Sequence, residues 1–161
     1  MILQTQNGAA QAGGMEAAMP RFQLDYKSFS DLHRLVRLKS LPLDGNSRFA
    51  SRLALYLPKA AARIDEDDFG ILHLEVGALK LDTRAAILRH DWTTVNEHFV
   101  FVTGMLETAG DELRDALHIS YLGMLLYGET SSSFVKARGL LPKPLMIALE
   151  KIELRYQDLA H

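Results

Sequence analysis

The stretch ILHLEVGALKLDTRAAIL, residues 71–88, decides the fold of this chain. Its apolar residues recur at intervals of three and four, at Ile71, Leu74, Ala78, Leu81, Ala85 and Leu88. That interval follows the 3.6-residue turn and predicts an amphipathic helix from Gly70 to Arg89. Leu72, Leu74 and Val76 also alternate as a strand would, but the helical pattern runs longer, so we interpret the stretch as a helix.

Helical signals repeat on both sides of this stretch. Phe49, Leu53 and Leu57 share one face of a helix that opens at residue 46 or 47. Pro58 is expected to break that helix, because proline removes a backbone donor and clashes with the preceding turn. A last helix is expected to begin near Pro144, since proline fits a first helical turn.

Two further helices are predicted between residues 94 and 128. Thr94 and Glu97 have the spacing of a capping box at the start of the first helix. Gly110 stands where a helix C-cap would, and Asp111 can cap the second helix. The two would form a tight αα-hairpin. With paired apolar faces throughout, the sequence predicts an all-α, compact multi-helix bundle of about six or seven helices around a central αα-hairpin.

Composition narrows the class of protein. The chain has 161 residues, no cysteine and a formal net charge of -2. That charge argues against a general nucleic-acid binder, and no apolar run approaches the roughly 20 residues of a membrane span. We therefore expect a cytoplasmic protein. Residues 1–20, rich in Gly, Ala and Gln, are expected to be a flexible tail, and residues 21–161 a single helical domain whose first helix lies near residues 28–38.

Histidines, serines and the single tryptophan give no catalytic or metal motif. His90, His98 and His118 lack the i, i+4 spacing of a helical zinc site, so surface or cap positions are expected. The run at residues 131–133 is interpreted as a polar turn. Trp92 is expected to pack, with a binding hot spot as the alternative. No catalytic, cofactor-binding or metal-ligating residue is predicted, and no cofactor is expected.

Two carboxylates stand apart from the rest. Glu75 and Asp82 lie one heptad apart on a largely apolar helix, and a carboxylate near a core must find a partner. Arg84 or Arg89 is the expected partner. Together with His98, this pair motivates an alternative function, a small helical enzyme or ligand-binding domain with a polar site between helices.

Charge is also distributed unevenly along the chain. Acidic residues that could form the rim of a protein interface are Asp65, Glu66, Asp67, Asp68, Asp111, Glu112 and Asp115. Basic residues gather between Arg34 and Arg52 instead, which leaves a regulatory module that contacts nucleic acid as a third interpretation.

The central block also resembles a family of small bacterial all-helical domains, often encoded beside polymorphic toxins. The resemblance covers residues 70–128, more weakly 140–152. It is carried by His90-Asp91-Trp92, Val95, Phe99, Met105-Leu106-Glu107, Gly110-Asp111-Glu112-Leu113 and Ser120-Tyr121-Leu122. Gly123 stands where the family prefers glutamate. The resemblance implies an immunity protein, and no catalytic residue is carried over.

The resulting hypothesis is a non-enzymatic binding protein that neutralises a cognate bacterial toxin. The expected partner is a toxin domain, whose active site would be covered by a rigid helical surface. The polar groups of such a bundle are expected to serve its exterior and its helix ends.

Overall fold

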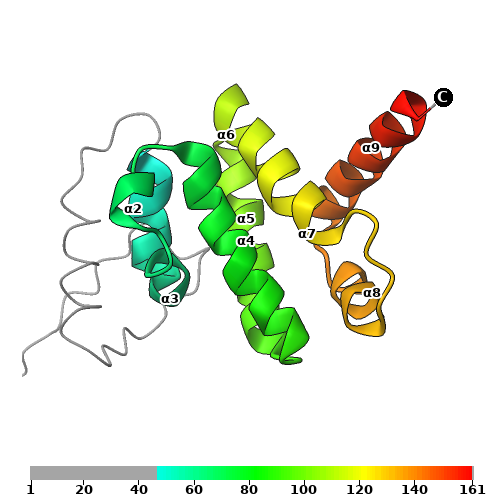
Figure 1. Ribbon diagram of the computed structural model, residues 1–161, viewed down its shortest axis with the longest axis horizontal. Coiled ribbons are helices and arrows are strands. Elements are labelled where there is room, and N and C mark those ends of the chain that lie inside the picture. The colour runs from blue at the N-terminus through cyan, green and yellow to red at the C-terminus, as the bar shows by residue number, and fades with distance from the viewer. Residues whose placement is uncertain (1–46, 161) are drawn as a thin grey trace, which may run out of the picture.

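The computed structural model describes residues 47–160, and all regular structure within them is helical (Figure 1). This confirms the predicted all-α bundle. The elements are α2 (Ser47–Tyr56), α3 (Pro58–Ala61), η1 (Glu66–Asp68), α4 (Leu72–Leu88), α5 (Trp92–Glu107), α6 (Asp111–Ala116), η2 (Leu117–Gly123), α7 (Met124–Leu126), α8 (Ser132–Gly139) and α9 (Lys143–Leu159). The predicted tail at 1–20, the helix near 28–38 and most of the basic segment lie outside the described residues.

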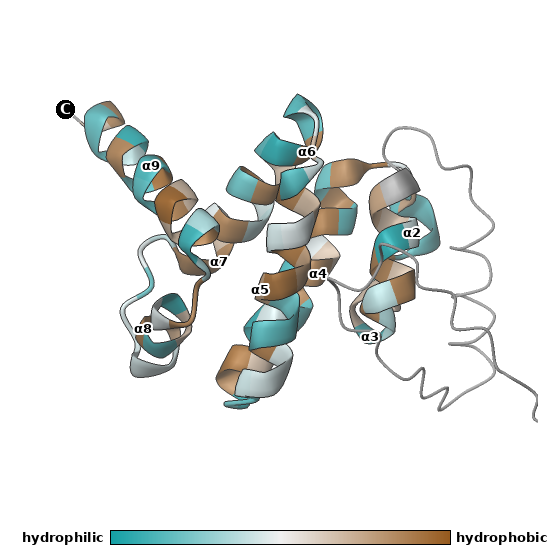
Figure 2. Cartoon of the chain, turned by 180° about the vertical axis from the view of Figure 1, so that it is seen from behind, coloured by the Kyte–Doolittle hydropathy of each residue, from teal (hydrophilic) through white to brown (hydrophobic). Residues whose placement is uncertain are grey.

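Helix α4 is the centre of the bundle. It contacts α2 and α3 on one side, α5 along its length, and η2 and α8 on the other side. Figure 1 shows α4 in front of α5, and Figure 2, seen from behind, shows α5 in front. The helical interpretation of residues 71–88 is confirmed. No helix among residues 47–160 combines the length and apolar composition that a membrane crossing requires.

Of two predicted helix boundaries, the structure confirms one and corrects the other. The break at Pro58 is confirmed, since α2 ends at Tyr56 and α3 begins at the proline. The capping box at Thr94 is wrong. Asp91 is the N-cap of α5, and its carboxylate accepts hydrogen bonds from the Thr94 backbone N–H at 3.2 Å and hydroxyl at 2.7 Å.

The segment after Gly110 departs further from prediction. Asp111 is the first residue of α6 rather than its cap, and the expected single helix changes into the π-helix η2 before α7. The main contacts of α5 and of η2 are with α4. The polar turn at 131–133 is wrong as well: Ser131 precedes α8, and Ser132 and Ser133 form its first turn.

The glycine in η2 lies where the π-helix meets α9. A Cβ atom at Gly123 would lie 3.3 Å from the His118 carbonyl oxygen and 3.6 Å from Cγ2 of Ile152 in α9. A Cβ atom would therefore be crowded by the backbone of η2 itself, whereas its distance to Ile152 would be an ordinary van der Waals contact. Gly123 thus lies where η2 meets α9, at the base from which α9 leaves the bundle.

The leucines of the apolar stripe that predicts α4 lie outside the core, although Ala78 on the same stripe is buried. Leu74, Leu81 and Leu88 are 45%, 51% and 58% exposed. The buried face of α4 carries apolar side chains together with three polar ones, namely Leu72, Glu75, Val76, Ala78, Leu79, Asp82, Thr83, Ala86 and Ile87. The periodicity therefore predicts the helix correctly, but Leu74, Leu81 and Leu88 form a second apolar face that is largely exposed.

Candidate functional site

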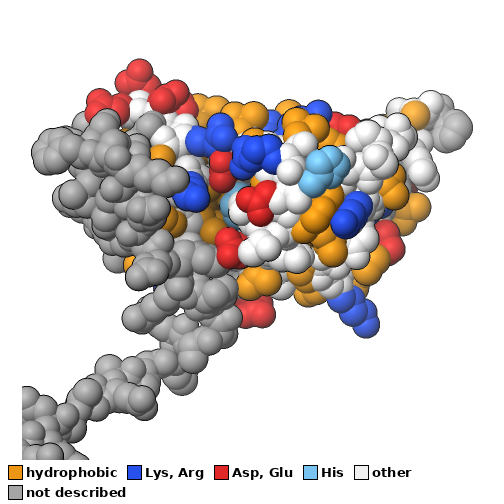
Figure 3. Space-filling model, turned by 90° about the horizontal axis from the view of Figure 1, so that it is seen from below, with side chains coloured by type: hydrophobic (Ala, Val, Ile, Leu, Met, Phe, Trp, Pro, Cys, Tyr) orange, Lys and Arg blue, Asp and Glu red, His pale blue; other side chains and the backbone are white. Residues whose placement is uncertain are grey.

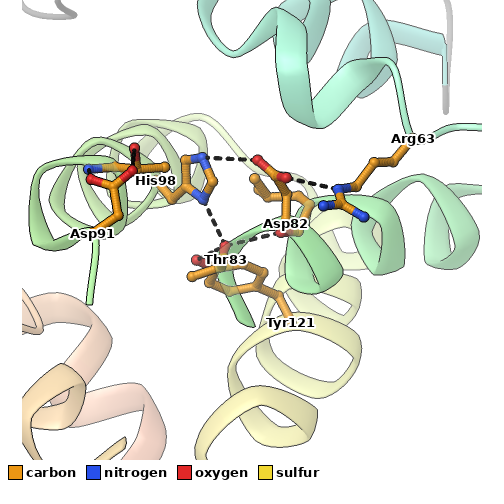
Figure 4. Close-up of polar contacts among 8 residues, drawn as sticks. Arg63, Asp82, Thr83, Asp91, His98 and Tyr121 are labelled. Atoms are coloured by element: carbon orange, nitrogen blue, oxygen red, sulfur yellow. Dashed lines mark hydrogen bonds and ion pairs between the residues drawn. The ribbon is translucent and has the colours of Figure 1, made fainter. Parts of the chain in front are cut away.

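A buried polar network joins four parts of the fold. Asp82 and Thr83 come from α4, His98 from α5, Tyr121 from η2, and Arg63 from the loop after α3 (Figure 4). Thr83, His98 and Tyr121 are at most 2% exposed and Asp82 is 8% exposed. Polar groups therefore do not serve only the exterior, and the expected surface position of His98 is wrong.

The hydroxyl of Thr83 organises this network. It donates its one hydrogen to the Leu79 carbonyl at 2.9 Å, as threonine in a helix commonly does. Its oxygen also lies 3.0 Å from the Tyr121 hydroxyl and 2.9 Å from Nδ1 of His98. The hydroxyl has one hydrogen for these three neighbours, so while that hydrogen lies on the Leu79 carbonyl, Tyr121 and Nδ1 of His98 both donate to the threonine oxygen.

The second ring nitrogen of His98 faces Asp82. Nε2 lies 3.6 Å from Oδ2 of Asp82, too far for a hydrogen bond. Burial lowers the pKa of His98 to about 4, although the Asp82 carboxylate opposes the shift. The ring is therefore neutral at pH 7.

The partner of Asp82 is neither of the arginines that the helical spacing suggests. Nε of Arg63 donates to Oδ1 of Asp82 at 2.7 Å, from a side chain that is partly exposed. Arg84 instead pairs with Glu129 at 2.6 Å and lies over the ring of Phe134. The predicted Arg84 or Arg89 partner is therefore wrong, because α4 turns its arginines away from the face that buries Asp82.

Glu75 is the second buried carboxylate of α4. It is fully buried, and its Oε1 accepts a hydrogen bond from the Gly70 N–H at 2.8 Å. Its Oε2 has no hydrogen-bond partner among the described residues. Burial raises the pKa of Glu75 to about 6, while the backbone N–H groups of Gly70 and Ala50 act in the opposite direction. Glu75 thus links the start of α4 to α2, and its ionisation near neutral pH destabilises the folded chain because the charge is buried.

Asp82, His98 and Thr83 are arranged in the order of an acid–imidazole–hydroxyl triad, but the threonine is not placed to act as a nucleophile. A nucleophile must reach a substrate, whereas the Thr83 hydroxyl is bonded to the Leu79 carbonyl of its own helix. The hydroxyl is also fully buried. This arrangement fits a network that fixes α4, α5 and η2 relative to one another.

The acidic residues predicted to bind a partner lie at the surface. Asp65, Glu66 and Asp67 are exposed and Asp68 is half-buried, all around η1 just before α4. Asp111, Glu112 and Asp115 are exposed on α6, which contacts α4. Both groups therefore border α4, and their role in binding stays a prediction.

Trp92 and His90 flank the start of α5. Trp92 packs against the core, and the ammonium group of Lys136 lies 4.5 Å from its ring centre. His90 adopts a left-handed backbone conformation, with φ of 59°, and its ring meets Trp92 edge-on. Trp92 thus has the packing role expected for it.

Within residues 47–160, no three His, Asp or Glu side chains are grouped so that they could hold a metal ion.

The chain matches no protein-family model, no curated protein and no solved structure. The class of protein is therefore given by its fold, an all-helical bundle with a polar network in its core.

The sequence indicated part of this network. The heptad spacing of Glu75 and Asp82 identified both buried carboxylates. Arg63, Thr83 and Tyr121 were missed, because Arg63 and Tyr121 are 19 and 38 residues from their α4 partners and carry no local pattern. Thr83 could have been noticed only as a polar neighbour of Asp82 on the same helix.

Proposed function

We propose that this protein is a helical protein-binding module that neutralises its partner by covering it. The observation that carries the proposal is the exposed stripe of α4, defined by Leu74, Leu81 and Leu88. Three leucines at heptad spacing on one helix face form the kind of surface that another helix or an apolar patch covers.

The size of the stripe suits a stable interface. From Leu74 to Leu88 the helix rises about 21 Å, at 1.5 Å per residue. A standard interface buries roughly 800 Å² on each partner, a patch of about 28 Å across. The α4 stripe could therefore form the apolar centre of one such interface. Hydrophobic side chains also lie between charged ones on the face seen from below (Figure 3).

The resemblance of residues 70–128 to immunity domains favours a toxin domain as the partner. The acidic residues around η1 and on α6 would form a charged rim beside the stripe and speed the capture of a basic partner. The buried network supports such a role, since it holds α4 rigidly between α5 and η2 and so limits the ordering that binding requires.

Co-expression with the protein encoded by the adjacent gene tests this proposal. If that protein is a toxin, the chain should restore growth and form a purified complex with it. Leu81→Lys should weaken the complex at least about tenfold, because it places a charge in the centre of the interface.

A matched control is available on α9. Leu154 is 60% exposed, close to the exposure of Leu88, but it lies on a different helix. Leu154→Lys should leave binding and growth unchanged. No complex and no growth rescue would refute the proposed function, and equal effects of Leu81→Lys and Leu154→Lys would refute the assignment to α4.

A further inference from the structure

A second surface lies where α9 leaves the bundle. At its base, Ile152 of α9 packs beside Gly123 of η2. Beyond this contact the two elements diverge, and the C-terminal half of α9 extends away from the other helices in both the front and back views (Figures 1 and 2).

The apolar face of α9 continues past the contact. Leu145, Leu149 and Ile152 are buried, and the same face continues at Tyr156 and Leu159 with the spacing of successive helical turns. Tyr156 is 42% exposed and Leu159 is 81% exposed. The helix therefore carries an amphipathic face whose last turns have no covering element among the described residues.

Aromatic side chains border this uncovered face. The rings of Tyr127, after α7, and Tyr156 lie 4.7 Å apart, and both side chains stay more than 40% exposed. Exposed tyrosines next to an apolar helix face are typical of binding surfaces, since they contribute contact area with little loss of side-chain entropy.

Basic side chains from two elements flank the same face. Arg114 of α6 and Lys151 and Arg155 of α9 all lower the pKa of His118, although burial is the larger cause, while Asp115 opposes them. Three cations and one carboxylate therefore act on His118. Two further carboxylates lie in the same half of α9: Glu153 pairs with Arg138, and Asp158 is exposed. The excess of positive charge is confined to the surroundings of His118.

We propose that the α9 surface, defined by Arg114, His118, Lys151, Arg155, Tyr156 and Leu159, binds an acidic amphipathic helix. The apolar side of that helix would cover Tyr156 and Leu159. Its carboxylates would meet Arg114, Lys151 and Arg155, a pairing that steers association and sets specificity. This partner is separate from the one proposed for the α4 stripe, and the surface does not depend on that function.

Fluorescence anisotropy with three synthetic peptides tests the proposal on the full chain. The probe is an amphipathic helix of leucine and glutamate, compared with a copy in which lysine replaces glutamate and one in which serine replaces leucine. Only the leucine–glutamate peptide should bind, and its affinity should fall about tenfold or more between low and high salt, as charge attraction between exposed groups is screened.

Variants connect the binding to this surface. Lys151→Glu with Arg155→Glu should reverse the preference toward the lysine peptide, and Leu159→Ser should abolish binding. Leu154→Lys, on another face of α9, and Leu81→Lys, on α4, should have no effect. The last control separates failure of this proposal from failure of the function proposed for α4.

Three results would overturn the proposal. One is equal affinity for the acidic and basic peptides, and another is peptide-induced NMR shifts confined to α4. The third is concentration-dependent self-association of the chain that Leu159→Ser abolishes, which would make a second copy of the chain the occupant of this surface.

Discussion

Replacing Glu75 with glutamine should stabilise the protein above pH 6. In the folded chain the pKa of Glu75 is about 6, against an ordinary value of 4.5. A folded-state pKa above the unfolded value means that stability is fully present below pH 4.5 and is lost as the pH rises through 6. The shift of 6 minus 4.5 corresponds to about 2 kcal/mol of lost stability at pH 8, at about 1.4 kcal/mol per pKa unit.

Glutamine keeps the shape of the side chain and can still accept the Gly70 hydrogen bond. It cannot ionise, so Glu75→Gln should match the parent protein near pH 4 and exceed its stability by up to about 2 kcal/mol at pH 8. Urea unfolding of both proteins from pH 4 to 8 measures this difference, and other titrating groups cancel in the comparison. A difference that stays flat across the range, or that favours the parent protein at pH 8, would refute the reasoning.

Three further predictions concern the network and the caps. The folded-state pKa of His98 is about 4, below its ordinary value of 6.5. Its contribution to stability is therefore fully present above pH 6.5, and up to about 3 kcal/mol is lost as the pH falls toward 4. His98→Gln should remove this pH dependence from acid unfolding curves, and an unchanged slope would contradict the prediction. Tyr121→Phe should lower the free energy of unfolding in urea by about 1 kcal/mol, because it removes one buried hydrogen bond. Tyr127→Phe, at an exposed tyrosine, should leave that free energy unchanged. Equal losses in the two variants would show that the Tyr121 hydroxyl does not stabilise the network. Asp91→Ala should cost about 1 kcal/mol by removing the α5 N-cap, and no loss of thermal stability would show that the cap is unimportant.

Much of the fold could be predicted because helix signals are local. The break at Pro58 and the helix start near Pro144 depend only on the geometry of proline, and the structure confirms both. The π-helix η2 could not be predicted, since it depends on packing against α4 and α9, which lie far away in the chain. The cap of α5 was misplaced for a smaller reason: Asp91 and Thr94 are both good N-cap residues, and the sequence alone does not choose between them.

The candidate site was likewise predicted only where the signal is local in the sequence. Helical spacing placed Glu75 and Asp82 correctly, but it predicted an arginine partner from α4 itself. The partner came instead from the loop at Arg63, because the face of α4 that buries Asp82 turns toward α3. Periodicity also identified the stripe at Leu74, Leu81 and Leu88 without revealing that it faces solvent. α4 is apolar on two faces, and only the packing of its neighbours decides which face is covered.

Methyl NMR of the leucines in complex with the partner tests the central claim most directly. The methyl signals of Leu74, Leu81 and Leu88 should shift together on binding, while those of Leu154 stay unchanged. A partner that binds tightly and leaves the three α4 leucines unshifted would contradict the claim that the exposed stripe of α4 is the binding surface.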